Sequence, residues 1–106
     1  MAIFKVEDYY YHIPVYMIND IPLLHNAYKF ESGKEIINTT LDIESMDIVV
    51  DFYNNGYVYC NILDAYHVAD YFMYDELKKY TCEFITEQFN VYGDAEMFEY
   101  INEIIV

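Results

Sequence analysis

The chain has few basic residues, few glycines and prolines, and no tryptophan. Its 106 residues include 5 Lys and Arg, 3 Gly, 2 Pro and 2 Cys, against 19 Asp and Glu. The formal net charge at pH 7 is therefore −14. Because so negative a surface repels phosphate, sequence-independent binding to nucleic acid or to an anionic membrane is not expected. The expected partner is basic or largely uncharged.

The scarcity of cysteine and glycine excludes several kinds of site. Cys60 and Cys82 form no Cys-x-x-Cys pair, so the sequence has neither a disulfide framework nor a zinc motif. No glycine-rich phosphate-binding loop occurs. We therefore predict no metal, no cofactor and a reducing compartment, the cytoplasm or the nucleus. The N-terminus lacks a signal peptide's apolar stretch, and no run reaches the ~20 apolar residues of a membrane span.

One group of residues has the spacing of half a metal site. His67 lies three residues from both Asp64 and Asp70, which on a helix can place imidazole and carboxylate on one side. With no second His or Cys ligand near it, a partly exposed histidine with local hydrogen bonds is the favoured interpretation. Cys60 and Cys82 are expected to be small core hydrophobes. We predict a protein that is not an enzyme, the alternative being an active site around His67 and Cys60.

Apolar periodicity predicts a small α+β domain with its strands in the first half. Alternating or β-branched apolar residues predict strands over 3–6, 9–16 and 37–43. A helix between the second and third strands would begin after Asn19 or Asp20, either of which can cap it. The apolar face of this helix would consist of Ile21, Leu24 and Tyr28.

The second half of the sequence is predicted to be helical. Ser45 is expected to cap a helix that ends at Gly56, and Asn61 to cap the next, after a short strand or extended link. Two helices separated at Tyr74-Asp75 would pack as an antiparallel hairpin, and Gly93-Asp94 would precede a last helix. The apolar stripes of the hairpin are Ile62, Ala65, Tyr66, Ala69 and Phe72, then Leu77, Tyr80, Thr81, Phe84 and Gln88.

Tyrosine is more abundant than a core of this size can hold. The chain has 14 Tyr and 7 Phe, and because buried hydroxyls need partners, several tyrosines must reach the surface, where they favour protein interfaces. AT-rich coding, as in a large DNA virus, also raises Tyr, but it would raise Lys as well, which is scarce here. Acidic residues lie mostly off the apolar stripes, as is typical of a solvated face: Asp47, Asp51, Glu76, Glu83, Glu87, Glu96 and Glu99.

The segment from Asp47 to Ile85 resembles the second half of a BTB/POZ domain, the fold shared with the Skp1 and elongin C adaptors. The residues that carry the resemblance are Phe52-Tyr53-Asn54-Asn55-Gly56, Ala69-Asp70-Tyr71-Phe72, Asp75-Glu76-Leu77-Lys78 and Cys82-Glu83-Phe84-Ile85. Upstream, residues 12–16 are similar to the family's entry into its first helix, and 37–43 to its third strand. The resemblance thus covers residues 3–89. The family's Tyr-Thr-Gly turn is Tyr-Asn-Asn-Gly in this chain.

This resemblance implies an α+β, BTB/POZ (Skp1-like) fold, a small three-stranded sheet flanked by a cluster of five to six helices. Residues 1–93 would form the BTB/POZ-like core, and 94–106 an additional C-terminal helix similar to the extension of Skp1. Dimeric members carry an extra strand and helix ahead of the core, whereas this chain begins at the core strand. A monomer is therefore expected in preference to the family's homodimer.

The resemblance also implies a function, that of a non-catalytic adaptor of a cullin-RING ubiquitin ligase. Such an adaptor links the N-terminal region of a cullin to a substrate receptor or, for a viral protein, to a host target. By family analogy the cullin face would include Tyr28, Phe30 and Glu31 after the first helix, and Tyr53 and Tyr57 near the turn after the second. The alternative is a self-associating BTB scaffold, transcriptional or cytoskeletal, without a ligase role.

Overall fold

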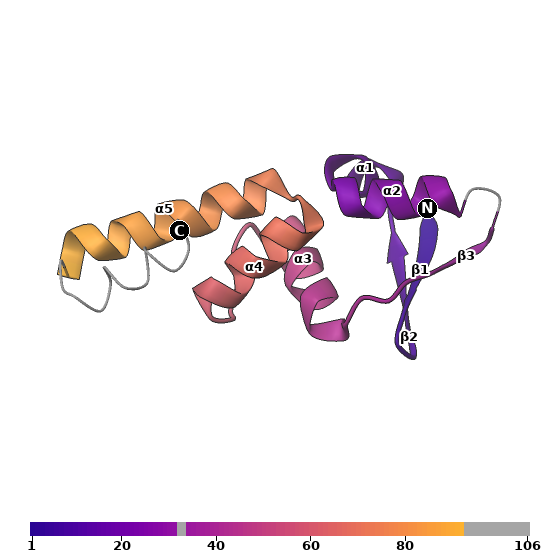
Figure 1. Cartoon of the computed structure of the whole chain (residues 1–106), viewed down its shortest axis with the longest axis horizontal. Helices are drawn as coiled ribbons and strands as arrows, with labels where there is room; N and C mark the ends of the chain where they lie inside the picture. The colour runs from indigo at the N-terminus through magenta and orange to yellow at the C-terminus, as the bar shows by residue number, and fades with distance from the viewer. Residues whose placement is uncertain (32–33, 93–106) are drawn as a thin grey trace.

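The computed structural model describes residues 1–31 and 34–92. Within them it has three strands and five helices, which confirms the predicted α+β class. Strands β1 (Ala2–Val6) and β2 (Tyr9–Ile13) form an antiparallel hairpin, and β3 (Ile36–Asn38) pairs with β1 in parallel, so the strand order is β2-β1-β3. The sheet and the first two helices lie at one end of the molecule, and the last two helices at the other (Figure 1).

The chain between β2 and β3 forms two helices where one was predicted. Helix α1 (Val15–Asp20) begins directly after Pro14, whose carbonyl accepts the N–H groups of Met17 and Ile18. Helix α2 (Pro22–Phe30) follows after the fully buried, extended Ile21. The predicted cap at Asn19 or Asp20 is therefore wrong, because burial of Ile18 and Ile21 in the core breaks the segment there. Strand β2 also ends three residues earlier than predicted, at Ile13.

Helix α3 (Ile43–Asn55) starts earlier than predicted, and β3 is correspondingly shorter. Its N-cap is Asp42, whose carboxylate accepts the backbone N–H of Ser45 at 3.2 Å and the Ser45 hydroxyl at 2.7 Å. Ser45 thus serves as the partner of the cap and is not the cap itself. The helix ends at Gly56, as predicted, in the left-handed conformation with φ 81°.

Helices α4 (Ile62–Phe72) and α5 (Asp75–Tyr92) pack as the predicted antiparallel hairpin (Figure 1). Asn61 caps α4 as expected, its Oδ1 accepting the N–H of Leu63 at 2.8 Å. The chain reverses at Met73, which adopts φ 56°. The link over residues 57–60 contains bends and no strand. The predicted last helix, 94–106, lies outside the described residues.

A continuous apolar core runs from the sheet to the start of α5. Its fully buried members include Phe4 from β1, Ile37 from β3, Val49 from α3, Phe72 from α4 and Leu77 from α5. Because one cluster joins all of these elements, the described chain forms one domain. Tyr74, at the α4–α5 connection, is 2% exposed, and burial raises its pKa. No described helix combines the length and the apolar character that crossing a membrane requires.

Candidate protein-interaction site

Three of the five residues expected at a protein interface lie together at the C-terminal end of α2. Phe30, the last residue of the helix, has 88% of its surface exposed, and Tyr28 has 40% exposed. Glu31 is the C-cap of the helix, and its carboxylate forms an ion pair of 2.7 Å with Nζ of Lys34. The exposure of Phe30 beside the half-exposed Tyr28 makes this helix end a candidate contact surface.

A mainly apolar hollow of about 270 Å³ adjoins Phe30. It is lined by Leu23 and Ala27 of α2, by Leu41 after β3, and by Tyr71 of α4. Tyr71 is 61% exposed, so the hollow has an exposed aromatic ring on each of two elements. Tyr71 was not among the residues predicted for an interface. Its position next to the buried Phe72, off the apolar stripe of α4, is the signal that could have identified it.

Tyr53 has a bracing role between two helices. Its hydroxyl donates to the carboxylate of Asp20 at 3.2 Å, and its ring centroid lies 6.0 Å from that of Tyr16. Burial, and then the hydrogen bond to Asp20, raise the pKa of Tyr53. The side chain is half-buried against the core, so Tyr53 connects the end of α3 to α1 and offers only part of its ring to a partner.

Tyr57 belongs to an aromatic pair just beyond α3. Its hydroxyl and that of Tyr59 are 2.8 Å apart, and the two rings meet edge to face with centroids 5.1 Å apart. Tyr57 is 44% exposed and Tyr59 is 81% exposed. The hydrogen bond with Tyr57 is the largest cause of a raised pKa at Tyr59. The pair presents an aromatic surface to solvent.

The five expected residues therefore occupy three places in the fold. Tyr28, Phe30 and Glu31 lie at the end of α2, Tyr53 lies against α1, and Tyr57 pairs with Tyr59. Within the described part of the chain, no hydrogen bond, ion pair or ring contact joins one of these places to another. The α2 end has the most exposed of these side chains and an adjoining hollow.

Cys60, Asp64 and His67, the residues considered for catalysis, line one hollow between α3 and α4. Burial raises the pKa of the half-buried Cys60 thiol, and the carboxylates of Asp64 and Asp51 add to the effect. A raised pKa lowers the thiolate fraction, which opposes nucleophilic use of Cys60. His67 is exposed beside the ring of Tyr66. Among the residues that the structure describes, no group of three or more His, Cys, Asp and Glu could hold a metal ion.

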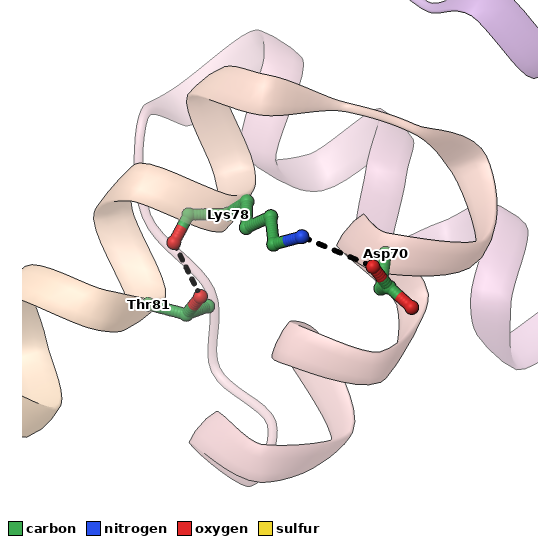
Figure 2. A network of polar contacts seen from close by, with 3 residues as sticks. All are labelled: Asp70, Lys78 and Thr81. Atoms are coloured by element: carbon green, nitrogen blue, oxygen red, sulfur yellow. Dashed lines mark hydrogen bonds and ion pairs between the residues drawn. The ribbon is translucent and has the colours of Figure 1, made fainter. Parts of the chain in front are cut away.

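Asp70, the third member of the group around His67, joins α4 to α5. Its Oδ1 accepts from Nζ of Lys78 at 3.1 Å, and the carbonyl of Lys78 in turn accepts the Thr81 hydroxyl at 2.8 Å (Figure 2). The hydrogen bond to Asp70 raises the pKa of Lys78. Thr81 can be fully buried because this bond satisfies its hydroxyl. Asp70 is thus a structural ion-pair partner.

Cys82 does not occupy the core position that was expected for it. Over residues 75–87 of α5, the buried side chains are Leu77, Thr81 and Ile85, which repeat every fourth residue. Cys82 follows Thr81 directly and therefore points away from this stripe, where its side chain is exposed. Phe84, also expected on the apolar stripe, is 38% exposed.

Comparisons of this chain with protein-family models, with curated proteins and with solved structures found no match.

Proposed function

We propose that this chain is a non-catalytic adaptor of a cullin-RING ubiquitin ligase, acting in the cytoplasm or nucleus. In this role it would link the N-terminal region of a cullin to a substrate receptor or host protein. The proposal rests on the resemblance of residues 3–89 to BTB/POZ domains. The order of elements, a strand hairpin, two helices, a third strand and three helices, is compatible with that resemblance.

The observation that carries the proposal furthest is the exposed aromatic end of α2. Phe30 is 88% exposed beside an apolar hollow, and Tyr28 is exposed two residues earlier. Aromatic side chains at the rim of an apolar hollow are typical of interface hot spots. Glu31, which lines the hollow, forms an ion pair with Lys34. Such a surface suits a partner that inserts an apolar side chain.

A pull-down with the N-terminal region of a cullin tests the proposal. We expect retention by the native chain and loss in the Phe30→Ala variant, with Tyr9→Ala as the matched control, since Tyr9 is an aromatic residue 61% exposed on β2. Tyr53→Ala is less suitable, because Tyr53 also braces α3 against α1. If no cullin is retained by the native chain, the adaptor role is wrong.

Light scattering distinguishes the adaptor from a self-associating BTB scaffold. The adaptor is expected to be a monomer at micromolar concentration, because association of two chains of charge −14 is opposed by repulsion. A stable dimer that retains no cullin would favour the scaffold.

A further inference from the structure

A second candidate surface lies between α3 and α4. Two hollows of about 500 and 280 Å³ share Asp47, Ile48 and Cys60 in their walls, so they form one continuous depression. We call it the α3–α4 groove. The residues that line it include none of the five expected at the cullin face. An inference about this groove does not rest on the function proposed above, although Tyr59 of its wall contacts Tyr57.

The groove has a mainly apolar floor. Ile48 of α3 and Val58 of the link after α3 are half-buried and pack against the core, and Val68 of α4 is 8% exposed. Tyr59, at the wall of the smaller hollow, is 81% exposed. A floor that rests on the core is held in place, and an apolar side chain of a partner could fill it at little ordering cost.

Carboxylates surround this floor on both helices. Glu44, Asp47 and Asp51 recur at helical spacing along one face of α3, and Asp64 lies across the groove on α4. All four are exposed. No Lys or Arg of the described residues lines the groove. The ion pairs of the described chain use other acids, namely Glu31 with Lys34, Asp70 with Lys78 and Glu83 with Lys79.

These observations decide between classes of occupant. A nucleic acid would bring more negative charge to the rim, and a second copy of the chain would bring a net charge of −14. The described residues offer no set of three ligands for a metal ion. What complements the groove is an apolar side chain flanked by cations, because each cation would meet a carboxylate that has no ion-pair partner within the described chain.

We propose that the α3–α4 groove binds a basic segment of a partner protein. An apolar side chain of that segment enters between Ile48 and Val58, and flanking Lys or Arg side chains meet the carboxylates of Asp51 and Asp64. The segment thereby supplies the positive charge that the described walls of the groove lack.

Fluorescence anisotropy with a dye-labelled peptide of sequence KLRKLK tests the proposal. The test variant is Asp51→Asn with Asp64→Asn, which keeps side-chain size and removes two rim charges. The control variant is Glu35→Gln with Glu87→Gln, which removes two exposed charges outside the groove. We expect Kd to rise at least about fivefold in the test variant and less than about twofold in the control. An equal loss in both variants would show mere attraction to the net charge and overturn the proposal.

A second arm tests the aromatic wall of the groove and the location of the bound peptide. Tyr59→Ser removes an exposed ring from the wall and is expected to weaken KLRKLK binding at least about threefold without loss of fold. Backbone NMR shifts on titration should concentrate at residues 44–51 and 58–68. Equal affinity for an uncharged leucine-serine peptide, shifts spread over the whole surface, or dimerisation that Tyr59→Ser abolishes would each reject a basic occupant.

Discussion

The hydroxyl of Tyr11 on β2 donates a hydrogen bond of 2.6 Å to the carboxylate of Asp47 on α3, 36 residues further along the chain. A second bond joins the same two parts of the fold, since the N–H of Ile43, the first residue of α3, donates to Oε2 of Glu7 at 2.9 Å. The strand hairpin therefore fixes the N-terminal half of α3, and with it one wall of the α3–α4 groove.

Removing the Tyr11 hydroxyl is expected to destabilise the protein modestly. In Tyr11→Phe the ring remains and only the bond to Asp47 is lost, so we expect the free energy of unfolding in urea to fall by about 0.5–1 kcal/mol. Tyr10→Phe, at the exposed neighbouring position on β2, is the matched control and should be neutral. Equal stability of the two variants would contradict a contribution from this bond.

Alkaline pH should weaken the fold through Tyr11 and Tyr74. Burial is the largest cause of a raised pKa at both, and at Tyr11 the bond to Asp47 adds to it. The folded state then holds these protons more tightly than the unfolded chain, whose tyrosines titrate at the ordinary pKa of 10.0. The contribution of these two tyrosines to the free energy of unfolding is complete below pH 10 and falls as the pH rises above 10. Urea unfolding at successive pH values should show this decrease, and Tyr11→Phe should reduce it.

Loss of the α3 cap is expected to cost about 1 kcal/mol. Asp42→Ala removes the acceptor for the Ser45 N–H and hydroxyl, whereas Glu44→Ala, in the same helical turn, removes only an exposed charge. The hydrogen bond from the Ser45 side chain is the largest cause of the lowered pKa of Asp42. The stability that the ionised Asp42 cap contributes is therefore present above the ordinary pKa of 3.8, and it is lost as the pH falls below that value. Urea unfolding of both variants at neutral and acidic pH measures these effects.

Gly56→Ala should destabilise the end of α3 by about 1 kcal/mol. The backbone has φ 81°, yet nothing lies within 4 Å of a Cβ added there, so the cost is conformational and not steric. Gly56→Asn should cost less, because Asn tolerates the left-handed conformation better. Thermal unfolding of the two variants compares them directly, and a larger loss for Asn would be inconsistent with this account.

The two cysteines should differ in their rate of alkylation. Cys82 is exposed on α5, whereas Cys60 is half-buried with a raised pKa. We expect iodoacetamide to modify Cys82 first, as followed by mass spectrometry in the Cys60→Ser and Cys82→Ser variants. Faster reaction at Cys60 would contradict the protection that its burial provides and revive its interpretation as a nucleophile.

Local chemistry explains which features the sequence could predict. The left-handed end at Gly56 and the cap at Asn61 depend on a few neighbouring residues, and both are confirmed. Helix α1 depends on distant contacts, such as the burial of Ile18 in the core, so periodicity missed it. The early start of α3 combines a local cap at Asp42 with a distant bond from the N–H of Ile43 to Glu7.

At the candidate site, too, local features could be predicted from the sequence, whereas contacts between distant segments could not. Exposure at Phe30 is compatible with its position at the end of a helix, but the hollow beside it requires Leu41 and Tyr71 from two other parts of the chain. No local pattern places these three residues together. The bracing of Tyr53 by Asp20 and Tyr16 was hidden for the same reason.

The parallel pairing of β1 with β3 has a consequence for folding. In this register Phe4 lies opposite Ile37, so completing the sheet closes a loop that contains β2, α1 and α2. Helices α4 and α5, by contrast, meet through a short connection at Met73. Because closing a long loop costs more entropy than closing a short one, the helical hairpin can form from local contacts while the third strand must wait for the segment it encloses.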